Sequence, residues 1–121
     1  MATVTVESPI RPEAPLEAEL LAKYFRVFAD PTRLRILEAL EQGELSVGAL
    51  AERLGVAQPK ASNHLACLRW CGFVATRREH RTVHYRLADE RVPAAIAIVR
   101  ALLAESAERV VACRRIDAGK R

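Results

Sequence analysis

The first part of the chain has apolar residues at helical spacing. From Leu16 onward they recur at intervals of three and four, which predicts a first helix that reaches Phe28. Asp30 and Pro31 then supply an N-cap and a proline for the first helical position. A second helix is therefore expected to begin here and to stop at Gly43.

Two more helices are predicted before the periodicity changes. Ser46 can cap a short third helix, which Gly55 ends. A fourth helix opens at Gln58 or Pro59 and ends before Gly72. Its inward-facing residues are expected to be Ala61, Leu65 and Leu68.

The pattern beyond the fourth helix alternates instead of following a helical period. Apolar and polar side chains alternate over residues 73–78 and 82–87, and Glu79, His80 and Arg81 stand between the two segments. This arrangement predicts a β-hairpin.

A long amphipathic helix completes the pattern, from about Asp89 or Val92 to Cys113. It and the first helix are apolar on more than one strip, so each needs a partner, for which the simplest candidate is a second copy of the chain. The fold class is therefore mainly α with a small β-hairpin: a winged helix-turn-helix whose dimer is formed by the first and last helices.

One domain is expected, because 121 residues suffice for one modest core. It should span residues 16–113, between a disordered arm at 1–15, which has three prolines, and a basic C-terminal tail at 114–121. The chain has no apolar run of membrane-spanning length, and its N-terminus does not read as a signal peptide. We therefore expect a cytoplasmic protein without a membrane partner.

Positive charge is concentrated in the middle of the chain. Residues 58–88 carry a net charge of +5, whereas residues 1–57 carry −3 and residues 89–121 carry +2. Such a cluster fits binding to the phosphate backbone of nucleic acid, because affinity there comes from counterions displaced at the contact face. Charge alone equally fits an ordinary solvated surface. An enzyme is not expected, because no nucleophile–base pair, glycine-rich phosphate loop or paired acids can be identified.

The three cysteines are candidate metal ligands. An odd number of thiols in a reducing compartment argues against a disulfide framework. Cys67 and Cys71 are four positions apart, which puts both sulfurs on one helix face, about 6 Å apart along the axis. Thiolates prefer soft cations. The alternative to metal binding is that both cysteines are simply small, buried, apolar residues of the core.

Four short segments, in the same order, closely resemble the ArsR/SmtB family of metal-responsive repressors over roughly residues 16–112. They are ADPTRLRIL at 29–37, LAERLG at 50–55, SNHL at 62–65 and YRL at 85–87. The resemblance implies a dimeric winged-helix protein that binds operator DNA when metal-free and releases it when an inducer metal binds.

The resemblance also narrows the position of the metal site. Family members with a third-helix site have two cysteines where this chain reads ELSVGAL at 44–50, and those with a zinc site on the last helix use histidines there, of which this chain has none after His84. The segment around Cys67 and Cys71 resembles that of the CmtR-type cadmium and lead sensors. In that subgroup these two cysteines and one near the C-terminus form a three-thiolate site across the dimer, which here implies Cys113. His64, three residues before Cys67, is an alternative fourth ligand, although contact with DNA or a backbone group is favoured for it.

Two groups of residues are expected to contact DNA. The first half of the fourth helix should meet base edges through Gln58, Lys60, Ser62, Asn63 and His64. The hairpin, as a wing, should bind phosphates or the minor groove through Arg77, Arg78 and Arg81, with His80 as a further candidate. The family usually has glycine where His80 stands, so a differently shaped wing tip is expected.

On the second helix, Thr32, Arg33 and Arg35 are further candidates for contact with phosphate. An ion pair to a nearby acid is the alternative for the arginines.

The function expected from these features is a repressor that binds a twofold-symmetric operator as a homodimer and is released by Cd(II) or Pb(II), with Zn(II) as a further candidate metal. One alternative keeps the fold and makes arsenite, As(III), the inducer, since it also accepts three sulfurs. Another is a thiol redox switch without metal, in which Cys113 would form a disulfide.

Overall fold

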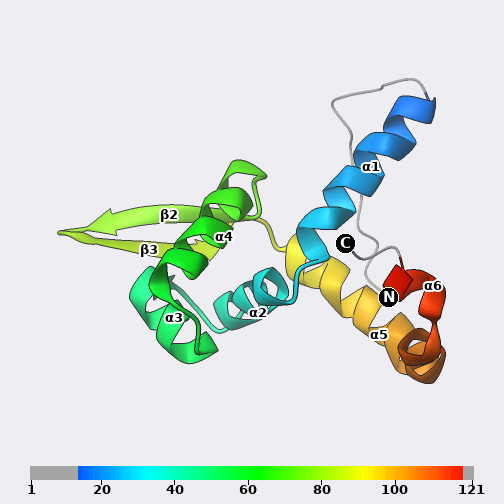
Figure 1. Cartoon of the computed structure of the whole chain (residues 1–121). Coiled ribbons are helices and arrows are strands. Elements are labelled where there is room, and N and C mark those ends of the chain that lie inside the picture. The colour runs from blue at the N-terminus through cyan, green and yellow to red at the C-terminus, as the bar shows by residue number, and fades with distance from the viewer. Residues whose placement is uncertain (1–13, 119–121) are drawn as a thin grey trace. The chain divides into compact units, whose positions relative to one another are not determined.

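The computed structural model describes residues 14–118, which divide into two compact units at Glu90 and Arg91. The described part of the first unit contains four helices and three short strands. In chain order these are α1 Ala14–Phe28, α2 Pro31–Leu40, β1 Leu45–Ser46, α3 Val47–Leu54, α4 Gln58–Trp70, β2 Val74–Glu79 and β3 Thr82–Leu87 (Figure 1). The second unit contains α5 Arg91–Ala112 and α6 Arg114–Ala118.

The predicted helix boundaries in the first unit are largely confirmed. Ser46 caps α3 by accepting a hydrogen bond from the Ala49 N–H at 3.2 Å, and Gly55 ends α3 in the left-handed conformation with φ 66°. Only a residue without a Cβ adopts that conformation cheaply. Asp30 caps α2 as expected, and α1 begins two residues before Leu16.

The core of the first unit comes mainly from α2, α3, α4 and the start of β2. Ala61, Leu65 and Leu68 are fully buried, which confirms the predicted inward stripe of α4. The other fully buried large side chains are Ile36, Leu37, Leu50 and Phe73. Phe73 packs edge-on against Tyr24 with ring centroids 5.0 Å apart, and its ring lies 4.9 Å from that of Phe28. These aromatic contacts connect α1 to the start of β2.

The sheet contains a strand that was not predicted. Its order is β1-β3-β2, and both pairs are antiparallel. β1 has only two residues, which pair as Leu45 with Tyr85 and Ser46 with His84. The predicted hairpin is confirmed as β2 and β3, and Figure 1 shows it extending beyond α3 and α4.

The hairpin turn is formed by two residues, His80 and Arg81, between the paired Glu79 and Thr82. His80 has φ 57°, so the histidine itself adopts the left-handed conformation that glycine would take most easily. This conformation costs histidine more conformational free energy than it would cost glycine at the same position.

The C-terminal segment differs from the prediction in two ways. α5 ends at Ala112, so Cys113 lies between α5 and α6 and not within the long helix. Residues 114–118 of the predicted tail form the short helix α6. Residues 1–13 of the predicted N-terminal arm lie outside the described residues. The last two residues of that arm, 14 and 15, belong to α1.

Apolar side chains on α1 and α5 are exposed in the single chain. They are Leu16, Leu20, Leu21, Tyr24 and Phe25 on α1, and Ile98, Val99, Leu102, Leu103, Val110 and Val111 on α5. Exposed apolar patches of this kind mark interaction surfaces, and these are the helices expected to meet a second copy. Between residues 14 and 118, no helix has the length and apolar character needed to cross a membrane.

Asp30 combines two interactions at the start of α2. Its Oδ1 accepts a hydrogen bond from the Arg33 N–H at 3.1 Å and lies 3.9 Å from Nε2 of His64. Burial alone would raise the pKa of this carboxyl, but the Arg33 hydrogen bond and the charge of His64 outweigh burial and hold the pKa below its usual value.

Replacing Asp30 by alanine is expected to lower the free energy of unfolding by about 1 kcal/mol, because α2 loses its cap. D30N keeps a capping oxygen and should lose clearly less. Because the folded-state pKa is lowered, the carboxylate stabilises the fold above its unfolded pKa of about 3.9, and this contribution is lost as the pH falls through the folded value. Urea unfolding at pH 7 and pH 3, at one protein concentration, measures both effects. An equal loss for D30N and D30A at pH 7 would show that charge, and not capping, dominates.

Candidate nucleic-acid interface and thiol pair

The helix-turn-helix consists of α3, the turn at Gly55 and α4. Four of the five polar residues predicted to meet base edges are exposed on the first two turns of α4: Gln58, Lys60, Ser62 and Asn63. The first half of this helix therefore presents hydrogen-bonding side chains to solvent, as a recognition helix requires.

His64, the fifth predicted base contact, is placed differently. Only 16% of its side chain is exposed, and its Nε2 lies 3.9 Å from Oδ1 of Asp30 at the start of α2. The structure therefore places the His64 imidazole beside the start of α2, and its contact with DNA stays a prediction. The sequence identified Asp30 as a cap but carried no signal for this second partner.

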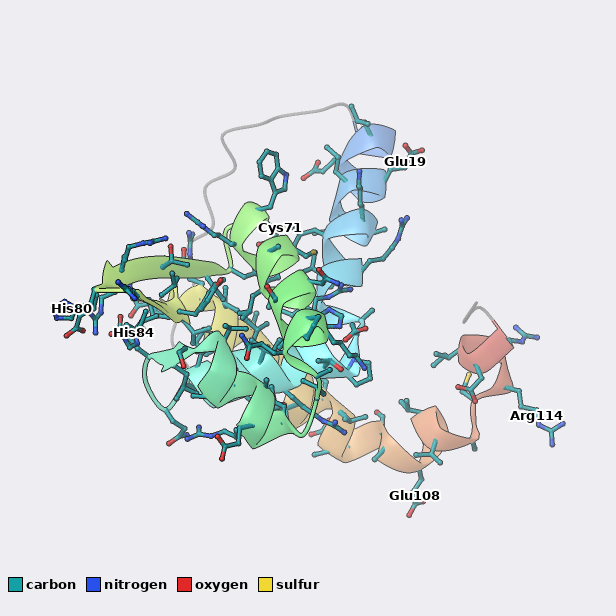
Figure 2. All side chains as sticks on the ribbon, turned by 60° about the vertical axis from the view of Figure 1, so that its left-hand side comes forward. Glu19, Cys71, His80, His84, Glu108 and Arg114 are labelled. Carbon is teal, nitrogen blue, oxygen red and sulfur yellow. The ribbon has the colours of Figure 1, made fainter. Side chains whose placement is uncertain are left out.

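The wing carries the predicted arginines in two different environments. Arg78 and Arg81 are exposed. Arg77 donates one hydrogen bond to Oε2 of Glu79 at 2.8 Å and another to Oε1 of Glu44 at 2.7 Å. These hydrogen bonds, the one to Glu79 foremost, raise the pKa of the Arg77 guanidinium. Figure 2 shows His80 at the tip of the hairpin and His84 further back.

Arg33 has a structural role that the sequence did not reveal. Its Nε donates a hydrogen bond to the carbonyl of Val27 at 2.8 Å, and its Nη2 donates one to the carbonyl of Arg26 at 3.0 Å. These carbonyls belong to the last turn of α1, where helices leave acceptors unpaired. In this structure Arg33 therefore caps the end of α1, and its contact with phosphate stays a prediction. Thr32 is buried, whereas Arg35 is exposed.

Cys67 and Cys71 lie together at the C-terminal end of α4, where Figure 2 marks Cys71. Cys67 is in the last turn, and Cys71 follows the final residue, Trp70, as the C-cap. The Cys71 N–H donates to the Cys67 carbonyl at 3.0 Å, which keeps the two residues one helical turn apart. Both thiols are free and partly buried. The structure therefore brings two of the three predicted ligands together.

The local environment of Cys71 favours the protonated form of its thiol, because it raises the thiol pKa. Burial raises the pKa of its thiol, and both the charge of Cys67 and a side-chain hydrogen bond with Cys67 raise it further. The positive charges of Arg33 and Lys23 act in the opposite direction but do not reverse the shift. Two adjacent soft donors fit a thiophilic cation, which would displace their protons on binding.

Cys113 lies between α5 and α6 in the second unit and is also free and partly buried. Among residues 14–118 of a single chain, no group of three potential ligands drawn from His, Cys, Asp and Glu is placed to hold an ion. The third predicted ligand therefore remains a prediction.

Comparison with known proteins identifies the family. The family model described as "Bacterial regulatory protein, arsR family" matches residues 30–76. The transcriptional regulator CmtR of Mycobacterium tuberculosis is 42% identical over 101 residues, which are 83% of this chain and 86% of that protein. A probable mercury resistance operon repressor of Streptomyces lividans is 39% identical over 95 residues, which are 78% of this chain and 76% of that protein.

A solved structure supports the same assignment. It is a homodimeric winged helix-turn-helix DNA-binding domain from Mycobacterium bovis, described as a possible ArsR-family transcriptional regulator. The TM-score is 0.70 at 31% identity, and the match covers 85% of this chain and 95% of that one. With a helix-turn-helix, a basic wing and these relatives, the chain belongs to the ArsR family of bacterial regulatory proteins, which bind DNA to control transcription and are not enzymes.

Proposed function

We propose that the chain is a metal-sensing transcriptional repressor. Its dimer binds operator DNA in the absence of metal and leaves it when Cys67, Cys71 and Cys113 hold a soft cation, Cd(II) or Pb(II). The observation that carries this proposal is the pair of free, partly buried thiols one helical turn apart at the C-terminal end of α4. Because the first turns of the same helix expose the polar side chains expected to meet bases, one helix serves both sites.

The chemistry of the thiols supports a soft inducer. Sulfur donors select soft cations over hard ones. Each of three thiols would lose its proton on becoming a ligand, so the site with a divalent ion would gain one net negative charge. On a helix that faces phosphate, this added charge opposes DNA binding.

The exposed apolar residues of α1 and α5 support a dimer, as does the homodimeric state of the similar Mycobacterium bovis domain. A twofold dimer presents two copies of α4, which suits an operator with twofold symmetry. Gln58, Lys60, Ser62 and Asn63 would contact bases, and the exposed Arg78 and Arg81 would contact phosphate.

The names of the relatives favour a thiophilic inducer. The Streptomyces lividans protein is described as a mercury resistance repressor, and mercury is likewise a soft metal. A redox switch is less favoured at Cys71, because a raised thiol pKa lowers the fraction of reactive thiolate. Arsenite, as a three-sulfur ligand, belongs among the inducers to be tested.

The proposal is tested by measuring release of the protein from DNA with a panel of inducers. The probe is a duplex selected from a random pool by the metal-free protein, and the additions are Cd(II), Pb(II), Hg(II), Zn(II) and As(III). Wild type is expected to dissociate with Cd(II) or Pb(II), and C113S is expected to respond at least tenfold more weakly because one of three sulfurs is lost. Thiolate-to-metal absorption, recorded on the same samples, reports binding separately from release.

Three outcomes would contradict parts of this proposal. If only As(III) released the protein from DNA, the inducer would be arsenite and not Cd(II) or Pb(II). An unchanged response of C113S would remove Cys113 from the site. Release by mild oxidation without any metal, together with a disulfide at Cys113 detected by mass spectrometry, would establish the redox alternative.

A further inference from the structure

Arg77 stands apart from the other arginines of the wing because two carboxylates hold its side chain. The Arg77 guanidinium donates to Glu44 at 2.7 Å and to Glu79 at 2.8 Å. Nε2 of His84 lies 3.9 Å from the same Glu79 oxygen. In the described part of the chain, neither Arg78 nor Arg81 takes part in an ion pair. We call the three residues Glu44, Arg77 and Glu79 the carboxylate–arginine bridge.

The bridge crosses the sheet. Arg77 belongs to β2, which is one edge strand, whereas Glu44 immediately precedes β1, the other edge strand. On the central strand, His84 is the partner of both Arg77 and Ser46. Because side chains of paired residues share a face, Arg77, His84 and Ser46 lie on one face of the sheet, and Glu79, two residues after Arg77, shares it.

Glu44 also leads directly into the helix-turn-helix. β1 follows it, and Ser46 at the end of β1 is the N-cap of α3. Only two residues of β1 pair with the hairpin, so the backbone alone provides few connections between wing and helices on this side. The bridge adds a side-chain connection from the outer strand of the wing to the segment that starts α3.

We propose that Arg77 is a positioning residue of the wing and not a phosphate contact. The carboxylate–arginine bridge holds the hairpin at a defined place relative to the segment that starts α3, and this sets where Arg78 and Arg81 stand when α4 enters the major groove. The Arg77 guanidinium is paired with the carboxylates of Glu44 and Glu79 within the fold. This inference depends on DNA binding by the winged helix and is independent of the metal.

The first test compares two glutamates of the same connecting segment. E44A removes the connection between Arg77 and the segment that starts α3, and leaves the hydrogen bond of Arg77 to Glu79 in place. The matched control E41A removes an equal charge from an exposed position three residues earlier. Binding to the selected duplex is measured by fluorescence anisotropy, and thermal unfolding checks that both variants are folded. E44A is expected to bind about fivefold more weakly than wild type, since a dimer loses two Glu44–Arg77 ion pairs of modest strength. E41A is expected to bind as well as wild type or slightly better, because an acid near phosphate has been removed.

Whether E44A binds DNA more weakly or more tightly than E41A decides whether the bridge positions the wing. If the bridge did not position the wing, removing Glu44 would only make the DNA-binding surface more positive, and E44A would bind at least as tightly as E41A. That result would overturn the proposal.

The second test combines E44A and R77A in a double-mutant cycle, with binding to the selected duplex measured in the same way. If Arg77 acts by holding Glu44, R77A should weaken binding in the wild-type background and change little further in the E44A background, because the connection is already broken there. If Arg77 instead contacts phosphate, R77A should weaken binding by the same factor in both backgrounds. That additive result would contradict the inference.

Discussion

The C67S variant is expected to bind DNA as tightly as wild type and to stay bound when Cd(II) or Pb(II) is added. Cys67 is partly buried in the last turn of α4, away from the exposed residues of its first turns, so serine should leave the DNA surface unchanged. Loss of one of the three proposed sulfurs should remove the coupling between metal and DNA. Such couplings are typically 1–3 kcal/mol, so the metal-induced weakening of up to about a hundredfold should disappear. The fluorescence anisotropy of a labelled duplex, titrated with protein in the presence and absence of metal, measures this weakening.

A matched control for C67S is A66S, which places a new hydroxyl on the adjacent, exposed position of the same helix. A66S should retain both DNA binding and release by metal. The proposed site is wrong if C67S still leaves DNA on addition of cadmium or lead. If metal-free C67S failed to bind DNA while remaining folded, Cys67 would instead be needed for the DNA-binding conformation itself.

Replacing Phe73 by alanine should have the largest effect on stability. The ring is fully buried, and it packs against Tyr24 and Phe28 with centroid distances of 5.0 and 4.9 Å. Truncation of a buried phenylalanine leaves a cavity and lowers the free energy of unfolding by about 3–5 kcal/mol. Urea unfolding measures this loss, with all proteins at one concentration because dimerisation contributes to apparent stability.

F73L provides the comparison for F73A. It keeps most of the buried apolar volume and loses mainly the ring contacts with α1, so its loss should be below about 1.5 kcal/mol. A loss of less than about 1 kcal/mol for F73A would mean that the aromatic contacts between α1 and the start of β2 contribute little to stability.

Features that depend on neighbours in the sequence were predicted well. Asp30 and Ser46 cap their helices because a capping side chain reaches a backbone N–H only three residues away. The stripe of Ala61, Leu65 and Leu68 follows from helical periodicity alone. The hairpin likewise follows from alternation within two short segments.

Features that depend on distant partners were not predicted. β1 is only two residues long, so no periodicity marks it. It exists through pairing with Tyr85 and His84, which lie 40 and 38 positions after Leu45 and Ser46. The same limit applies to side chains. Arg77 and His64 resemble DNA contacts in the sequence, but each meets an acid that the fold brings from far along the chain.

The candidate metal site divides along the same line. The proximity of Cys67 and Cys71 follows from helical spacing, and the structure confirms it. The contribution of Cys113 depends on how a different unit, or a second copy, approaches α4. No local rule specifies that approach. Cys113 is therefore proposed as a ligand from the family resemblance, and the C113S experiment tests it.

The position of Ser46 has a consequence for engineering. This residue ends β1 and caps α3, so no spacer separates the sheet of the wing from the first helix of the DNA-binding motif. A chimera that exchanged only residues 74–87 with a homologous hairpin would leave Glu44, Leu45 and Ser46 facing foreign partners. The wing is therefore not a transferable cassette, and a functional exchange must carry residues 44–46 together with the hairpin.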